Sequence, residues 1–268
     1  MNADSTLLRD AVVVITGASS GIGQALARAL VKKRPGRVWL VARRLDRLHQ
    51  LADELGPVAR PYACDLADAD ARAELVSVIP KVDVLVNNAG CHAGGWLVER
   101  ARQQPDSLTQ LVQVNCEAPV HLVAMWAPGM VERGRGFILN VGSIAGMFPT
   151  PGTAAYGGSK AFINNFSEAL YLELRSKGVH VHLSVPGPVD DTEFFNSLQP
   201  ASYYKPSSIA VSAERVAFEA VNGLLSGTFR RTPGVRARLA SRLMRATPRP
   251  IAHRILDWWH AYYGDGSG

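Results

Sequence analysis

A tyrosine and a lysine stand four residues apart near the middle of the chain, at Tyr156 and Lys160. On a helix this spacing places both side chains on one face, about 5–6 Å apart at Cβ. An ammonium group beside a phenol favours the phenolate, because a nearby opposite charge stabilises the ionised form. A phenol shifted towards neutral pH in this way can exchange a proton with an alcohol or carbonyl oxygen. We expect Ser143, at the end of an adjacent strand, to hydrogen-bond the same oxygen.

Such a pair is weak evidence by itself, because helices also carry Tyr and Lys at this spacing on solvated faces. It gains meaning beside a redox cofactor, for which the N-terminal segment predicts a site. Residues 11–16 form a continuous apolar run, typical of a strand buried on both faces of a parallel sheet. Gly17-Ala-Ser-Ser-Gly21-Ile-Gly23 follows directly, and a stretch of helical composition begins at Gln24.

The three glycines of this loop let the backbone turn tightly and approach a pyrophosphate without Cβ collisions. The helix that follows would point its free N–H groups and the positive end of its dipole at that anion. The spacing is Gly-x-x-x-Gly-x-Gly, which differs from the usual dinucleotide fingerprint Gly-x-Gly-x-x-Gly. A glycine-rich turn without a ligand is the alternative.

The second expected strand, residues 37–42, ends in Arg43 and Arg44. In dinucleotide-binding folds this position faces the adenosine ribose, where a carboxylate would bind the 2′-hydroxyl and repel a 2′-phosphate. Arginine instead pairs well with phosphate through its charge and fork geometry. The pattern therefore favours NADPH over NADH, unless the arginines only begin a solvated helix.

With these motifs the chain resembles the classical short-chain dehydrogenase/reductase family. The resemblance runs from residue 11 to about residue 195 and rests on Thr16-Gly-Ala-Ser-Ser-Gly-Ile-Gly23, Asn87-Asn-Ala-Gly90, Asn115, Ser143, Tyr156, Lys160 and Pro186-Gly187. It implies a catalytic set of Asn115, Ser143, Tyr156 and Lys160. In that set Tyr156 is the acid/base and Ser143 orients the substrate oxygen. Lys160 lowers the Tyr156 pKa and holds the nicotinamide ribose, and Asn115 anchors a water that links Lys160 to solvent.

The resemblance also implies the residues that contact the cofactor. Asp65 and Leu66 follow the third strand near the adenine, and Thr192 would bond the pyrophosphate. Asp190 and Asp191 depart from the commoner pattern, because they place two acids near a phosphate. The full expected set is Gly17, Ser19, Ser20, Gly21, Ile22, Arg43, Arg44, Asp65, Leu66, Asn88, Ala89, Gly90, Tyr156, Lys160, Pro186, Gly187, Val189 and Thr192.

The alternation of strand-like and helical stretches predicts the α/β class, with a doubly wound parallel sheet of six to seven strands in a single Rossmann-like domain. Strands are expected at 11–16, 37–42, about 57–63, 82–87, 136–141 and 179–185, with a seventh near 227–232. A helix is expected over 108–123. We assign residues 1–230 to this domain, including a substrate lid at about 188–212, and residues 231–268 to a C-terminal extension.

The extension is basic, in a chain whose net charge is +6. Its arginines and apolar residues predict an amphipathic helix that Pro248 and Pro250 interrupt. Such a helix either packs on its own domain or a partner subunit, covers the substrate, or lies on an anionic membrane surface. The basic and apolar residues of this C-terminal part of the chain are Arg230, Arg231, Arg236, Arg238, Arg242, Arg245, Arg249 and Arg254, with Leu239, Leu243, Met244, Ile251, Ile255, Leu256, Trp258 and Trp259.

Composition excludes several classes of protein. Hydrophobic content of 47% and charged content of 19% indicate a globular chain and not a disordered one. No nucleic-acid recognition motif accompanies the charge. Neither a signal peptide nor a transmembrane run is evident. The three cysteines, Cys64, Cys91 and Cys116, lack metal-ligand spacing, so we expect no metal site. They predict reduced thiols in a cytoplasmic protein. The protein would be peripheral at a membrane if the extension binds one.

Together these features predict an NADPH-dependent oxidoreductase that interconverts a carbonyl and a secondary alcohol. Gly94-Gly-Trp96, Met147-Phe148-Pro149 and Phe194-Phe195 predict an apolar pocket, so we expect a lipophilic ketone. A 3-oxoacyl-thioester reductase and a non-catalytic NADP(H) sensor are the alternatives. The apolar stripe Phe162, Phe166, Leu170 and Leu174 on the tyrosine helix predicts a homodimer or homotetramer.

Overall fold

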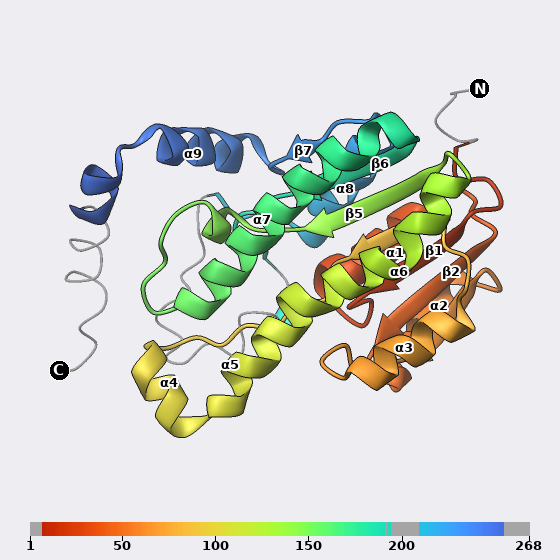
Figure 1. Ribbon diagram of the computed structural model, residues 1–268, viewed down its shortest axis with the longest axis horizontal. Coiled ribbons are helices and arrows are strands. Elements are labelled where there is room, and N and C mark those ends of the chain that lie inside the picture. The colour runs from red at the N-terminus through yellow and green to blue at the C-terminus, as the bar shows by residue number, and fades with distance from the viewer. Residues whose placement is uncertain (1–6, 191, 194–208, 255–268) are drawn as a thin grey trace.

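A parallel seven-stranded sheet forms the centre of the protein (Figure 1). The computed structural model describes residues 7–190, 192–193 and 209–254, and the account that follows is confined to them. The strand order is β3-β2-β1-β4-β5-β6-β7. The strands are β1 Val12–Thr16, β2 Arg37–Ala42, β3 Ala59–Ala63, β4 Val84–Asn87, β5 Gly136–Val141, β6 Val179–Ser184 and β7 Arg230–Arg231.

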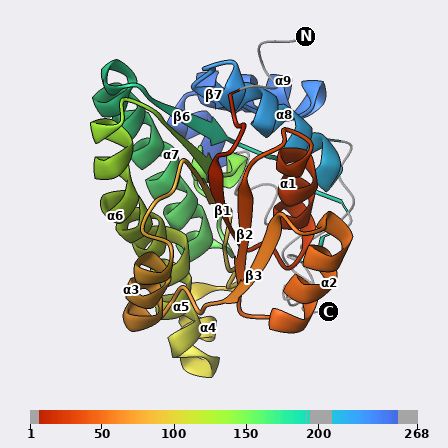
Figure 2. The ribbon, with the colours of Figure 1, turned by 90° about the vertical axis from the view of Figure 1, so that its right-hand side faces the viewer.

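Helices cover both faces of the sheet and make three layers, as the view along the layers shows (Figure 2). One face carries α1 Gly21–Val31, α2 Leu45–Leu55 and α8 Ala213–Leu225. The other carries α3 Ala69–Val78, α6 Ala118–Glu132 and α7 Ala154–Leu174. The helices α4 Leu97–Gln103 and α5 Pro105–Val112 precede α6, and α9 Val235–Ala246 follows β7.

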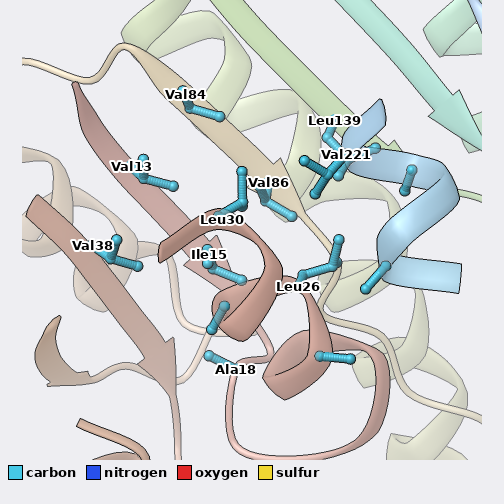
Figure 3. Packing of buried hydrophobic residues seen from close by; sticks show 14 of the residues in the cluster. Val13, Ile15, Ala18, Leu26, Leu30, Val38, Val84, Val86, Leu139 and Val221 are labelled. Atoms are coloured by element: carbon cyan, nitrogen blue, oxygen red, sulfur yellow. The ribbon is translucent and has the colours of Figure 1, made fainter. Parts of the chain in front are cut away.

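Alternate side chains of the central strands supply two separate hydrophobic cores. Val13 and Ile15 of β1 enter the core under α1 and α8, whereas Val14 enters the core under α6 and α7. Leu26 and Leu30 of α1 lie over Val13, Ile15 and Val86 in the first core (Figure 3). Burial on both sides explains why β1 and β4 are almost continuously apolar and do not alternate with polar residues.

The architecture confirms the predicted doubly wound α/β fold. The first six strands begin and end within one or two residues of their predicted bounds, and the seventh is the shortest, with a start three residues later than predicted. It is short because only Leu183 and Ser184 of β6 pair with it. The expected helix over 108–123 is instead α5 and α6 joined by a π-helical turn at Gln113–Glu117.

The C-terminal helix α9 lies at the edge of the molecule (Figure 1). It ends at Ala246, just before the predicted interruption at Pro248, but residues 249–254 are helical again, so the predicted interruption at Pro250 is wrong. Ala237 and Ser241 are buried against the domain, and Arg238 donates to Glu219 of α8 at 3.0 Å. None of the helices in the described part of the chain is both long and apolar enough to cross a bilayer. Four apolar residues expected in the tail lie outside the described residues: Ile255, Leu256, Trp258 and Trp259.

Candidate active site

A cleft of about 890 Å³ opens along the edge of the sheet where the parallel strands end. The segments after β1, β2, β3, β4, β5 and β6 all contribute to it. In the strand order the connections reverse direction between β1 and β4, and in open parallel sheets ligands bind at that switch point. The loops that follow these two strands therefore define the cofactor end of the site.

The glycine-rich loop after β1 packs directly on the turn after β4. A Cβ on Gly17, whose φ is +66°, would lie 2.8 Å from the Cα of Ala89. A Cβ on Gly23 would lie 2.1 Å from the Gly17 carbonyl oxygen. Both positions need glycine because the backbone of the loop, of α1 and of the turn approach this closely. The first turn of α1 lies within the described residues and holds no acidic side chain. The positive N-terminal end of this helix can therefore bind an anion.

Thr16 and Asn88 hold the two loops together. The Thr16 hydroxyl donates to the Val86 carbonyl at 3.0 Å and accepts from the backbone N–H groups of Asn88 and Ala89. The Asn88 amide donates back to the carbonyls of Thr16 and Gly17 at 2.9 and 3.2 Å. Asn88, Ala89 and Gly90 line the cleft, as do Gly17, Ser19, Ser20, Gly21 and Ile22. The residues of these two loops that we predicted to contact the cofactor thus line the same cleft.

Both arginines after β2 line the same cleft, and Arg44 makes the more extensive contacts. Its guanidinium donates to the Ser20 hydroxyl at 2.9 Å and to the Ser19 hydroxyl at 3.1 Å. It also pairs with the carboxylate of Glu193 at 2.9 Å. These contacts place a positive group between the glycine-rich loop and the segment after β6.

Asp65 and Leu66 border the cleft beyond β3. The Asp65 carboxylate accepts from the backbone of Ala67 at 3.0 Å. The Leu66 carbonyl accepts from the guanidinium of Arg72 at 2.7 Å, and Arg72 is buried, with an ion pair to Glu117. A buried charge with these partners fixes the backbone at the expected adenine end.

The proposed catalytic side chains meet at the other end of the cleft. Ser143 follows β5 and caps the short 3₁₀ turn Ile144–Gly146, where its hydroxyl accepts from the backbone of Ala145 at 3.1 Å. Tyr156 and Lys160 lie one turn apart on α7, and all three are buried. The Lys160 ammonium donates to the Val141 carbonyl at 3.0 Å and lies 5.8 Å from the centre of the Tyr156 ring.

Burial shifts the pKa values of this pair in a direction that corrects the sequence expectation. Desolvation raises the pKa of Tyr156 to about 12, against the opposing effect of a hydrogen bond with Ser143. Desolvation also lowers the pKa of Lys160 to about 8. We expected the ammonium to bring the phenol towards neutral pH. Instead, loss of water around both groups dominates, because each charged form is costly in a dry site.

Asn115 lies on the π-helical turn and bridges two parts of the site. Its amide donates to the Cys91 carbonyl and the Ser159 hydroxyl, each at 3.0 Å, and its oxygen accepts from the Cys91 backbone at 2.8 Å. Both amide N–H donors are thereby used, so Asn115 has only acceptor atoms left for a water. These bonds hold the segment after Gly90 against α7, and the water link to Lys160 stays a prediction.

The segment after β6 lines the cleft beside the glycine-rich loop. Pro186, Gly187, Val189 and Thr192 all line the cleft. Val189 pairs in parallel with Val211, and the Thr192 hydroxyl donates to the Val189 carbonyl at 3.4 Å. The Thr192 methyl lies so close to Gly21 that a Cβ there would be 3.0 Å away. Asp190 is exposed, and Asp191 lies outside the described residues.

Three further residues lie at the site: His92, Arg47 and Glu193. The His92 ring lies against Tyr156, with centroids 4.4 Å apart, and burial lowers its pKa to about 4, so it is neutral. Arg47, on the first turn of α2, and Glu193 complete the cluster around Arg44. Arg47 follows Arg44 by three residues, a spacing that could have suggested a shared helical face. The pairing with Glu193 spans 149 residues and leaves no sequence signal.

The expected pocket walls are only partly present. Phe148 lines the cleft, together with Ile144, Ala145 and Pro151. Met147 instead packs against Ile163 and Leu183. Trp96 is 44% exposed at the start of α4. Phe194 and Phe195 lie outside the described residues.

A doubly wound sheet with this cleft and these side chains defines a nucleotide-dependent oxidoreductase, and the comparisons identify which kind. Residues 11–202 match the family model described as short chain dehydrogenase. The chain therefore belongs to the short-chain dehydrogenase family.

Relatives of known name agree with this assignment. The NADP-dependent 3-hydroxy acid dehydrogenase YdfG of Escherichia coli strain K12 is 34% identical over 189 residues, which are 69% of this chain and 75% of the relative. The very-long-chain 3-oxoacyl-CoA reductase of Neurospora crassa is 38% identical over 182 residues, 64% of this chain and 54% of the relative. A short-chain dehydrogenase from Sphingobium yanoikuyae, solved in complex with NADPH, superimposes with a TM-score of 0.76 and 28% identity, covering 89% of this chain and 97% of that one.

Proposed function

We propose that this protein reduces a carbonyl group to a secondary alcohol with NADPH. The observation that carries the proposal is the burial of Tyr156, Ser143 and Lys160 together at one end of the cleft, whose other end holds Arg43 and Arg44. The first group can move a proton to or from oxygen, and the second suits a ribose 2′-phosphate. NADP-dependence of the E. coli relative supports the choice of cofactor.

The glycine-rich loop, the start of α1 and the arginines would hold the cofactor, which supplies a hydride when bound. Tyr156 would donate its proton to the carbonyl oxygen while Ser143 hydrogen-bonds that oxygen. A phenol whose pKa is near 12 is protonated at neutral pH and is therefore ready to donate. Lys160 would hold positive charge beside the phenolate that this transfer creates, and Asn115 would keep the loop after Gly90 in place.

We propose a lipophilic ketone as the substrate. Ile144, Phe148 and Pro151 give the described wall beside Ser143 an apolar character. The neutral ring of His92 lies at the same end. A 3-oxoacyl thioester is the second candidate, favoured because one relative is named as a 3-oxoacyl-CoA reductase. A non-catalytic NADP(H) sensor is disfavoured because a sensor needs no buried proton donor.

Replacing the proton donor tests the proposal. Tyr156→Phe should lower kcat roughly a hundredfold to ten-thousandfold, the usual contribution of a general acid, while leaving NADPH affinity unchanged. Tyr171→Phe, on the same helix but packed on Phe229, is the matched control and should keep full activity. Turnover would be followed by NADPH absorbance with lipophilic ketones, 3-oxoacyl thioesters and steroid ketones. Equal turnover by the two variants would rule out this chemistry.

We also propose that the protein is a homodimer or homotetramer that assembles through α6 and α7. Phe162 and Phe166 stack on α7 with centroids 5.8 Å apart, and Phe162 is 42% exposed. Met125 of α6 is exposed as well. Apolar side chains that are exposed in one chain can be covered by a second chain, and a two-fold contact would pair these helices with themselves.

We further propose that residues 231–268 form an extension of the domain that touches an anionic membrane surface. On α9, Val235, Leu239 and Leu243 recur every four residues and are 71%, 59% and 62% exposed. Arg236 and Arg242 are exposed on either side of this stripe. An apolar stripe flanked by basic residues suits the interface of an anionic bilayer. Packing by Ala237 and Ser241 uses the opposite side of the same helix.

A further inference from the structure

A carboxylate from a distant part of the chain lies in the arginine cluster at the cofactor end of the cleft. Glu193 accepts from Arg44 at 2.9 Å and from Arg47 at 2.8 Å. The other side of the Arg44 guanidinium donates to the hydroxyls of Ser19 and Ser20. Two guanidinium groups thus hold one carboxylate, and Arg44 is itself held by two hydroxyls.

The backbone that carries Glu193 lies directly against the glycine-rich loop. The preceding residue, Thr192, contacts Gly21, and both Thr192 and Glu193 line the cleft. Arg47 and then Arg44 hold the pKa of Glu193 at about 2, so the carboxylate is ionised at any working pH. Glu193 therefore carries its negative charge whenever it contacts the two arginines.

We infer that Glu193 competes with the 2′-phosphate of NADPH for Arg44 and Arg47. The inference rests on the proposed function, which assigns this end of the cleft to that phosphate. A phosphate forms bidentate, charge-assisted bonds with arginine, as the carboxylate does, so the two anions require the same donors. The competitor lowers NADPH affinity and leaves NADH affinity unchanged, because NADH carries no group that needs the arginines.

The exchange is feasible because all of these partners face solvent. The side chains of Arg44, Arg47 and Glu193 are 42%, 36% and 51% exposed. Ion pairs with this exposure contribute little each, and a dianion can displace a single carboxylate from them. The structural consequence is that binding of the 2′-phosphate releases Glu193 from Arg44 and Arg47.

Binding measurements on Glu193→Gln test the inference. Titration calorimetry with NADPH, NADH, adenosine 2′-phosphate and adenosine 5′-phosphate gives four affinities for each protein. The variant should bind NADPH and adenosine 2′-phosphate about threefold to tenfold more tightly, with the other two affinities unchanged. Glu54→Gln is the matched control, because Glu54 also forms an exposed pair with an arginine, Arg28, at 2.7 Å. It removes the same charge and should change none of the four values.

Two other results would overturn the inference. Weaker binding of the 2′-phosphate ligands by Glu193→Gln would show that the carboxylate positions the arginines instead of competing for them. An equal gain for NADH would show a general charge effect. If the wild type itself did not prefer the 2′-phosphate ligands, the proposed cofactor choice would fail, which is a separate outcome. Arg44→Gln should weaken the binding of NADPH and adenosine 2′-phosphate, both in the wild type and in Glu193→Gln.

Discussion

The chemistry of the site depends on two side chains whose pKa values move in opposite directions. Burial raises the pKa of Tyr156 to about 12 and lowers that of Lys160 to about 8. The spacing of the two residues on a helix could be read from the sequence. The depth of their burial could not, because it depends on Leu111 and Ala93, which pack on Tyr156 from other elements. The sign of the tyrosine shift was therefore predicted wrongly.

These directions predict the pH dependence of carbonyl reduction. Tyr156 stays protonated across pH 6–10, whereas Lys160 loses its charge as the pH rises through about 8. The charge that stabilises the new phenolate disappears with it, so kcat/KM should be flat below pH 8 and fall above it. Initial rates at low ketone concentration measure this profile. A rate that rises above pH 8 would mean that the phenolate is the active form.

Among the elements, the contact between β6 and α8 is unusually close. His182 of β6 is fully buried and bonds the Thr228 carbonyl at 2.6 Å. A Cβ on Gly223 of α8 would lie 2.2 Å from the ring of His182. A glycine inside a helix normally lowers stability, and here it lets the helix lie against the imidazole.

Two substitutions of glycine by alanine should therefore have opposite effects. Gly223→Ala should reduce the free energy of unfolding by about 1–3 kcal/mol, because the ring has no room to move. Gly158→Ala, in α7, meets nothing within 4 Å and should raise it by up to about 1 kcal/mol through helix propensity. Urea unfolding of both variants measures the difference. A stabilised Gly223→Ala would contradict the packing described for His182.

The strands were predictable as elements because a buried parallel strand is a continuous apolar run between turn residues. Three features were not predictable in the same way. The π-helical turn at Asn115 is set by hydrogen bonds to Cys91 and Ser159, which come from other elements. The brevity of β7 reflects its pairing with only two residues of β6. The Arg44–Glu193 contact joins segments 149 residues apart.

At the scale of the whole molecule, the membrane contact proposed for α9 can be tested directly. Flotation with vesicles containing anionic phospholipid should recover the wild type, and vesicles of neutral lipid should recover less. Leu239→Ser combined with Leu243→Ser should abolish recovery, because it removes most of the apolar stripe. Val78→Ser, at an exposed apolar position on α3, is the control and should float like the wild type. If the wild type does not float, the helix has only a packing role.

The order of the strands also determines when the protein can acquire its shape during synthesis. The first strand lies between β2 and β4, so the ribosome must deliver Val84 to Val86 before the inner edge of β1 is covered. The sheet cannot extend further until β5 and β6 emerge, and α8, which closes one face, comes later still. A fragment that ends before β4 would expose an apolar edge of β1, and an exposed edge of this kind favours aggregation.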